Sequence, residues 1–229
     1  MRASYREILA MPFSHSFGLS RLRASLLAGN AIDVHSGLKN APQILKSILD
    51  NDVQGIGLVP AALEIFHQLG RKRVKDLAAN LEYIEIGSSE LSKNIREWLS
   101  LNFDRTKIWH HYGMTEASRS FFVRRGAFDD TSKSDHIGQP ADGVSYEIVD
   151  IDKNGLGELW ISGRNVAHGY FGLNDLTNKK FVKGGFLTGD IVRKVNGKLV
   201  LQGRVDSIIN VGGQKVDGSE LEANIEAIE

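Results

Sequence analysis

The sequence contains no cysteine among its 229 residues. This absence excludes disulfide bridges, thiolate zinc sites and cysteine nucleophiles, and it fits a reducing compartment, so we expect the protein in the cytoplasm. The sequence also has no apolar run near the roughly 20 residues that a membrane-spanning helix needs. Its first residues, MRASYREILAMPFSHS, lack the apolar core of a signal peptide. We therefore expect neither a membrane span nor secretion.

An excess of charge of either sign is missing as well. Lys plus Arg and Asp plus Glu are both 28, so the formal net charge is +0. No global field attracts nucleic acid or an anionic membrane, and any anion site has to be local. Signature motifs of several enzyme classes are also absent: the GxxxxGK(S/T) phosphate loop, GxGxxG after a strand, GxSxG and HExxH. The enzyme classes that depend on those motifs are therefore disfavoured.

Short apolar runs that alternate with helical periodicity fill the first half of the chain. This alternation is typical of βα units in a mostly parallel sheet with helices on its faces. Strands are expected at 6–11, 31–34, 55–59, 81–86 and 107–111, and helices at 18–29, 44–49, 60–70 and 90–101. In the first of these helices the leucines at 19, 22, 26 and 27 share one face, and Gly29 ends it. Ligands of such folds bind beyond the carboxyl ends of the strands, so we expect a site in the loops after Ile86 and His111.

The pattern changes after about Gly126 to short strands separated by turn residues, as in VSYEIVD, GELWISG and FLTGDIVRKV. Such a pattern is typical of a small antiparallel, barrel-like β subdomain. A short strand, a Gly212-Gly213 turn and a helical pattern to the last residue then indicate the start of another domain. We predict an α/β fold in three parts: a layered α/β part at 1–130, the β subdomain at 131–203, and a hinge with the truncated start of a C-terminal domain at 204–229.

The sharpest local motif is HHYGMTEAS, residues 110–118, which follows a buried strand. In this motif Tyr112 can stack on a flat base and Gly113 lets the backbone approach a ligand. Thr115 can donate to a phosphate, and Glu116 can serve as an oxygen ligand of Mg²⁺. The alternative is an ordinary exit from a strand into a loop.

Two further segments carry charged side chains of interest. Asp190, in FLTGDIV, can accept from two vicinal hydroxyls as the acidic residue of dinucleotide folds does, or it can be an ordinary turn aspartate. Arg204 and Asp206 lie between the β subdomain and the last segment, where they can also form no more than a charged linker.

Together and in this order, these segments resemble the adenylate-forming superfamily of acyl-CoA synthetases, aryl-CoA ligases, luciferases and carrier-loading adenylation domains. The matching segments are MPFSHSFG, EIGSSEL, HHYGMTEAS, GELWISGRNVAHGYFG, FLTGDIV and GRVDSIINVGGQKV. They span nearly the whole chain, and their spacing agrees with the family. Two departures are GSSEL in place of the commoner GGAPL, and Gly218 where a proline is usual.

The resemblance implies roles for residues at the nucleotide. Tyr112 would stack on adenine, and Asp190 would accept from the ribose hydroxyls with support from Arg204. Thr115 would contact phosphate, and Glu116 would help to hold Mg²⁺. The turn lining the base and the acyl carboxylate would be formed by Gly87, Ser88 and Ser89.

It also implies roles around the acid and the thiol. His15 matches an aromatic position near the acyl pocket, with a structural histidine as the alternative, and His111 would border the same pocket. Asp206 matches the hinge about which the small C-terminal domain rotates. Gly212 and Gly213 match a loop facing the pantetheine thiol, or they form only a tight turn.

The implied reaction has two steps and uses ATP with Mg²⁺, a carboxylic acid and CoA. The carboxylate attacks the α-phosphate of ATP to give acyl-AMP and pyrophosphate, and a thiol then displaces AMP. The family's Ser/Thr/Gly-rich phosphate loop and its catalytic lysine have no match in the chain, so we expect little or no adenylation from this polypeptide alone. The alternatives are an adenylation domain that loads a phosphopantetheine carrier protein, and a non-catalytic nucleotide-binding remnant.

Overall fold

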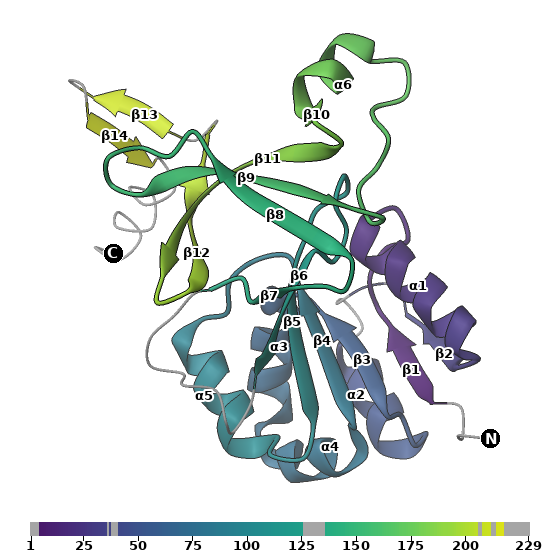
Figure 1. Cartoon of the computed structure of the whole chain (residues 1–229). Coiled ribbons are helices and arrows are strands. Elements are labelled where there is room, and N and C mark those ends of the chain that lie inside the picture. The colour runs from purple at the N-terminus through teal and green to yellow at the C-terminus, as the bar shows by residue number, and fades with distance from the viewer. Residues whose placement is uncertain are drawn as a thin grey trace. The chain divides into compact units, whose positions relative to one another are not determined.

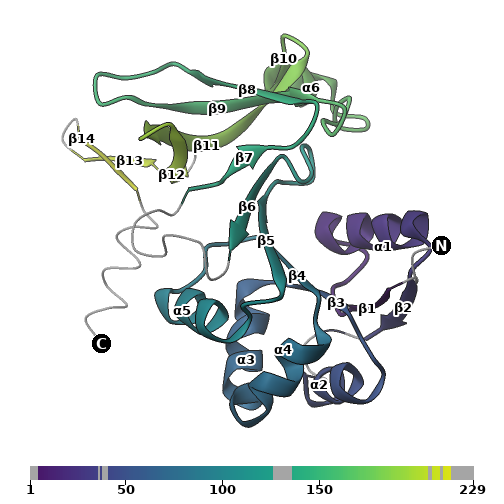
Figure 2. The same ribbon diagram turned by 60° about the horizontal axis from the view of Figure 1, so that its bottom comes forward.

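A computed structural model describes residues 5–35, 37, 41–125, 136–205, 208–211 and 214–217. The chain forms two compact units, Met1–Ser134 and Asp135–Glu229. Figures 1 and 2 show the elements of each. None of the helices in the described part of the chain is long and apolar enough to cross a membrane.

The first unit is built on a sheet whose strands run in the order β2-β1-β3-β4-β5-β6. The first five strands of the sequence pair in parallel, and β6 is antiparallel to β5. The strands are β1 (Arg6–Leu9), β2 (Ala31–Val34), β3 (Gly55–Leu58), β4 (Tyr83–Gly87), β5 (Lys107–Tyr112) and β6 (Phe121–Arg125). The carboxyl ends of the parallel strands therefore meet at one edge, as the sequence predicts.

Helices cover both faces of this sheet. One face carries α1, and the other carries α2 to α5 (Figure 2). The helices are α1 (Ser16–Ala28), α2 (Ala41–Asp50), α3 (Pro60–Gly70), α4 (Val74–Asn80) and α5 (Lys93–Asn102), with a 3₁₀ turn at Arg71–Arg73. Gly29 caps α1 with a left-handed φ of 72°. The bounds of α3 are those that the sequence predicts.

The two faces of the sheet differ in chemistry. Because side chains alternate along a strand, Ile8, Ile84 and Ile108 turn to the α2–α5 side and form the apolar core there. The α1 side receives the neighbouring residues, among them Glu7 and Glu85, which are both buried. The leucine face predicted for α1 does not cover the sheet: Leu26 is 63% exposed and Leu27 is 90% exposed. The helix turns its polar residues to the sheet instead.

The second unit is mainly an antiparallel sheet with the order β10-β11-β9-β8, in which β12 also pairs with β11. Its elements are β7 (Gln139–Pro140), β8 (Val144–Val149), β9 (Leu156–Gly163), α6 (Asn174–Lys180), β10 (Phe181–Val182), β11 (Gly185–Val195) and β12 (Lys198–Arg204). A separate hairpin pairs β13 (Ile208–Val211) with β14 (Gln214–Asp217). The parallel sheet with flanking helices and the antiparallel second sheet confirm the predicted fold class, although α6 was not predicted.

Candidate functional site

A cavity of about 790 Å³ lies at the carboxyl ends of the parallel strands of the first unit. Its walls come from the turn between β1 and α1, the ends of β3 and β4, and the loop between β5 and β6. This is the edge at which α/β sheets bind ligands.

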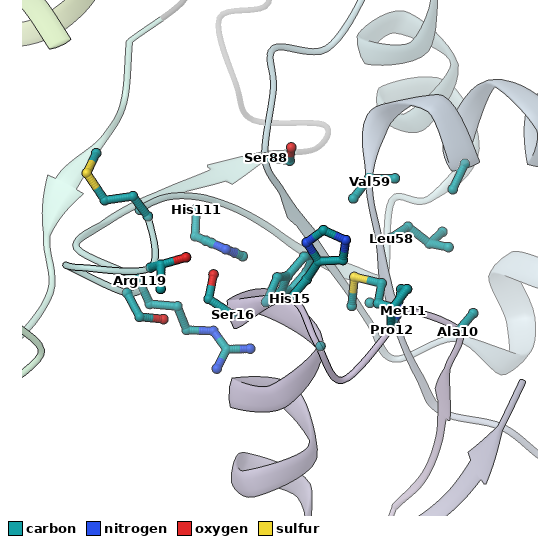
Figure 3. A pocket seen from close by; sticks show the side chains of 18 of the residues that line it. Ala10, Met11, Pro12, His15, Ser16, Leu58, Val59, Ser88, His111 and Arg119 are labelled. Carbon is teal, nitrogen blue, oxygen red and sulfur yellow. The ribbon is translucent and has the colours of Figure 1, made fainter. Parts of the chain in front are cut away.

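One wall of the cavity is apolar. It consists of Ala10, Met11 and Pro12 from the turn after β1, with Leu58 and Val59 from the end of β3 (Figure 3). A hydrocarbon body placed against this wall is removed from water, which favours binding by about 25 cal/mol for each Å² buried. The wall therefore suits the apolar part of a small organic molecule.

The opposite wall is polar. Ser16, His111 and Arg119 line it, and the His15 ring points into the same space from the start of α1 (Figure 3). His15 is the N-cap residue of α1 and is exposed. His111 is buried, with 7% of its surface exposed.

The loop between β5 and β6 carries the sharpest motif of the sequence and folds as a tight turn. The amide of Met114 donates to the Ala117 carbonyl at 3.1 Å, and the amide of Ser120 donates to the Tyr112 carbonyl at 2.9 Å. A Cβ at Gly113 would collide with the backbone nitrogen of Arg119, so only glycine fits there. The turn places Gly113, Thr115 and Glu116 on the cavity wall.

The end of β4 holds the turn that the sequence predicts beside the nucleotide. A Cβ at Gly87 would collide with the His111 ring, so the glycine leaves room for that ring beside the strand. Ser88 lines the cavity with a φ of 92°, a backbone conformation that favours glycine. The carbonyl of Ser89 lies 3.0 Å from Nε2 of His110. Burial, followed by the charge of Arg125, lowers the pKa of His110 to about 4.

A buried carboxylate, Glu85, lies beneath the polar wall. Its oxygens accept from Nη1 of Arg21 at 2.8 Å and from Nε of Arg119 at 2.7 Å, and Nδ1 of His111 lies 3.2 Å away. Burial by itself would raise the pKa of Glu85, but His111, Arg119 and Arg21 together outweigh it and hold the pKa at about 2. Glu85 is therefore ionised at neutral pH.

Arg21 of α1 connects Glu85 to a second buried carboxylate. Its Nη2 donates to Glu7 of β1 at 2.5 Å and also contacts the Tyr83 hydroxyl. Ser25, one turn further along α1, donates to the same Glu7 oxygen at 2.5 Å. Glu7, Arg21, Glu85, His111 and Arg119 are hereafter called the Glu85 cluster.

Asp190 and Arg204 lie in the second unit and contact each other. The register of β11 and β12 sets them opposite, and Nη1 of Arg204 donates to Oδ1 of Asp190 at 2.7 Å. The Asp190 side chain is 8% exposed, whereas that of Arg204 is 47% exposed. The pair lies where the register of β11 shifts between Leu187 and Ile191, and the Asp190 backbone amide donates to the Thr188 hydroxyl at 3.0 Å.

Metal binding rests on Glu116 alone among the predicted residues. Within the described ranges, no group of three or more His, Cys, Asp or Glu side chains is arranged to hold a metal ion. Mg²⁺ commonly takes one or two protein carboxylates and completes its shell with phosphates and water. A single carboxylate on the cavity wall, beside a threonine hydroxyl, fits that pattern.

The structure brings part of the predicted site together. The predicted residues on the cavity wall are His15, Ser88, His111, Gly113, Thr115 and Glu116. Gly87, Ser89 and Tyr112 are sequence neighbours of these but are not lining residues, and Tyr112 packs edge-on to Phe121 at 5.9 Å. Asp206, Gly212 and Gly213 lie outside the described residues.

Sequence reasoning named His111 but missed Ser16 and the other members of the Glu85 cluster, Glu7, Arg21, Glu85 and Arg119. The signal was present, because the parallel strands of a covered sheet are normally apolar throughout, yet Glu7 and Glu85 interrupt β1 and β4. A charged residue inside such a strand needs a buried partner. Which partner it finds depends on tertiary packing, which the sequence pattern does not specify.

Comparison with known proteins identifies the family. The model of the AMP-binding enzyme family matches residues 2–171, so the chain belongs to the AMP-binding enzymes, as its resemblance to the adenylate-forming superfamily predicts. Among curated proteins, 2-succinylbenzoate--CoA ligase of Staphylococcus aureus is 31% identical over 93% of this chain and 42% of its own length. Tyrocidine synthase 3 of Brevibacillus parabrevis is 29% identical over 87% of this chain and 3% of its own length.

Solved structures show the same fold. The O-succinylbenzoate Coenzyme A synthetase (MenE) of Bacillus subtilis in complex with AMP has a TM-score of 0.83 and 24% identity, covering 96% of this chain and 45% of that one. ATP-bound MatB of Rhodopseudomonas palustris has a TM-score of 0.80 and 22% identity, covering 98% of this chain and 45% of that one. The chain thus spans less than half the length of these relatives.

Proposed function

We propose that the chain forms the acid-binding and adenylate-binding part of an AMP-forming acid–thiol ligase that acts on a carboxylic acid and CoA. The observation that carries this proposal is the cavity at the carboxyl ends of the parallel strands, where an apolar wall faces the loop that bears Thr115 and Glu116. Membership of the AMP-binding enzymes supports the nucleotide part, and the name of the S. aureus relative supports a CoA thiol as acceptor.

The chemistry divides into two balanced steps. A carboxylate oxygen attacks the α-phosphorus of ATP, the bond to the β-phosphate oxygen breaks, and pyrophosphate leaves. The sulfur of CoA then attacks the acyl carbon, AMP leaves, and the thiol proton is released. In both steps the protein accelerates the reaction mainly by holding the reacting groups in place and by neutralising charge on the phosphates.

Residues of both units take roles in this proposal. Thr115 donates to a phosphate oxygen, and Glu116 holds Mg²⁺, which neutralises phosphate charge when bound. Tyr112 stacks on adenine, with Gly87, Ser88 and Ser89 forming the turn on the other side of the base. Asp190 accepts from the ribose hydroxyls, and Arg204 donates a hydrogen bond to the Asp190 carboxylate. His15 and His111 border the acid.

We also propose that this polypeptide alone supports little or no adenylation. Its 229 residues include no match to the family's phosphate loop and none to its catalytic lysine. Without those groups the β- and γ-phosphates lack donors, and the transferring group lacks a cationic partner. Exchange of labelled pyrophosphate into ATP, measured with a panel of acids, is expected to stay at the level of a sample without protein.

The second candidate is an adenylation domain that loads a carrier protein, which the likeness to tyrocidine synthase 3 favours. The test uses the polypeptide that the intact gene encodes, incubated with ATP, Mg²⁺ and an acid. AMP release that requires free CoA supports the ligase. Transfer to a phosphopantetheine carrier, with no response to CoA, supports the second candidate. A gene product that lacks both the phosphate loop and the lysine and releases no AMP with either acceptor supports a non-catalytic remnant.

A further inference from the structure

The second unit holds a lysine close to the proposed ribose carboxylate. Lys180 is the last residue of α6, and this helix leads directly into β10, which pairs with the start of β11 (Figure 1). Further along β11 the same strand carries Gly189 and Asp190. The chain therefore returns the end of α6 to the strand that bears Asp190.

Two cationic side chains approach the backbone at Gly189. A Cβ at this position would lie 3.1 Å from Nη2 of Arg204 and 3.7 Å from Nζ of Lys180. Gly189 has a left-handed φ of 77°, and its amide donates to Oε1 of Glu158 at 2.8 Å. The absence of a side chain here lets both cations come close to the backbone next to Asp190.

The two cations differ in their partners. Nη1 of Arg204 donates to Oδ1 of Asp190, whereas the Lys180 side chain forms no ion pair or hydrogen bond within the described ranges. Lys180 is half-buried, so its ammonium group has lost part of its hydration and also lies near a charge of the same sign. A hydrogen-bond acceptor supplied by a bound molecule would stabilise this ammonium group, which has three N–H donors.

A ribose hydroxyl suits a place where a carboxylate and an ammonium group lie close together. Each hydroxyl has one O–H donor and two acceptor lone pairs. A carboxylate can only accept and an ammonium group can only donate, so one hydroxyl can donate to Asp190 and accept from Lys180 at the same time. A carboxylate offers about four acceptor positions, so the hydrogen bond from Arg204 still leaves positions for the ribose.

We propose that Lys180 is a further ribose-binding residue, which donates a hydrogen bond to a hydroxyl oxygen of the ribose that Asp190 holds. This inference rests on the proposed function, in which Asp190 accepts from the ribose hydroxyls. Lys180 then helps to select ribonucleotides over deoxyribonucleotides. A sugar that lacks the contacted hydroxyl leaves the half-buried ammonium group without its acceptor.

The test is calorimetric titration of AMP, 2′-deoxy-AMP and 3′-deoxy-AMP, each with Mg²⁺, into the parent chain, Lys180→Met and Lys179→Met. Methionine keeps an unbranched apolar stem and removes the ammonium group. Lys179 precedes Lys180 in α6 and is exposed, so Lys179→Met is the matched control. Because α6 has no buried residue, neither substitution removes core packing, and both variants are expected to fold like the parent.

The expected result is a loss of affinity that depends on the sugar. A hydrogen bond from a charged donor corresponds to roughly 10- to 100-fold in Kd, so Lys180→Met is expected to weaken AMP binding by that factor. The deoxynucleotide that lacks the contacted hydroxyl is expected to bind the parent and Lys180→Met alike. Lys179→Met is expected to match the parent with all three nucleotides.

An unchanged Kd for AMP in Lys180→Met overturns the inference. An equal loss with all three nucleotides also overturns it, because that result indicates a contact to the phosphate or the base. If Asp190→Ala loses AMP binding while Lys180→Met keeps it, the proposed function stands and the ribose role of Lys180 fails. No binding of AMP by the folded parent overturns the proposed adenylate site, and this inference with it.

Discussion

Ser88 is a single residue whose backbone departs from what its type favours. It has a φ of 92° at the end of β4, where the commoner family segment has glycine. A non-glycine residue in this region costs on the order of 1–3 kcal/mol. We predict that Ser88→Gly raises the free energy of unfolding by about 1 kcal/mol, because the relief of strain exceeds the entropy that glycine adds to the unfolded chain. Urea unfolding measures the change.

The neighbouring serine supplies the control for this substitution. Ser89 has no positive φ, so Ser89→Gly is expected to lower stability by about 0.5–1 kcal/mol through unfolded-state entropy alone. If both substitutions lower stability equally, Ser88 carries no strain in solution.

His110 is a residue whose titration reports its burial. The pKa of His110 is about 4 in the folded chain and 6.5 ordinarily. Between pH 4 and pH 6.5 the ring is therefore protonated in the unfolded chain but neutral in the folded chain. The stability linked to neutral His110 is therefore complete above pH 6.5 and is lost as the pH falls toward 4. An NMR titration of the His110 ring is expected to give a midpoint near 4. A midpoint near 6.5 would show that the ring is open to water.

At the scale of the elements, α1 is attached to the sheet through charge, since Arg21 and Ser25 meet Glu7 while Leu26 and Leu27 face outward. We predict that Glu85→Gln lowers the free energy of unfolding at pH 7 by about 3 kcal/mol, because Arg21 and Arg119 lose a buried counter-charge. Thermal or urea unfolding of parent and variant gives the difference.

The pH dependence of that difference has a definite sign. The pKa of Glu85 is about 2 in the fold against 4.5 ordinarily, so its contribution is present above pH 4.5 and is lost as the pH falls toward 2. The difference in free energy of unfolding between the parent and Glu85→Gln should therefore become smaller as the pH falls from 4.5 to 2. Glu97→Gln, whose partner Lys93 is 3.9 Å away on the exposed face of α5, is expected to change stability by less than about 0.5 kcal/mol. A Glu85→Gln effect no larger than that of the control would contradict a buried ionic attachment.

Periodicity in the sequence locates the strands and most of the helices, because apolar spacing reflects burial on one face. It places α3 at its observed bounds, from Pro60 to Gly70. It does not show that the leucine face of α1 is turned away from the sheet. Helical periodicity shows which residues share a face of the helix, but not which other element that face packs against. The short polar helix α6 has no buried residue and hence no apolar period to detect.

For the candidate site, motifs identify the residues near the ends of strands. They do not identify the buried residues that contact those lining residues. The order of the parallel strands brings His15, Ser88, His111 and the loop at Thr115 to one cavity, and each of these stands in or beside a recognisable segment. Glu85 and Arg119 are 34 residues apart, and the hydrogen bond between them forms only when the sheet has folded. Asp190 and Arg204 are 14 residues apart and pair because β11 and β12 are antiparallel neighbours.

At the scale of the whole molecule, the residues proposed to contact the adenylate belong to two compact units: Thr115 and Glu116 to the first, and Asp190 to the second. In the second unit the proposed contact is the buried carboxylate of Asp190, which accepts from Arg204, while the Asp190 backbone amide donates to the Thr188 hydroxyl.

The most direct measurement is calorimetric titration of AMP with Mg²⁺ into the parent chain, Asp190→Ala and the control Asp175→Ala, which alters an aspartate of α6. Removal of hydrogen bonds to a charged acceptor corresponds to roughly 10- to 100-fold in Kd. The parent and Asp175→Ala are expected to bind AMP alike, and Asp190→Ala is expected to bind it weaker by that factor. Equal binding by all three would contradict the ribose role of Asp190, and no binding by the folded parent would contradict an adenylate site in this chain.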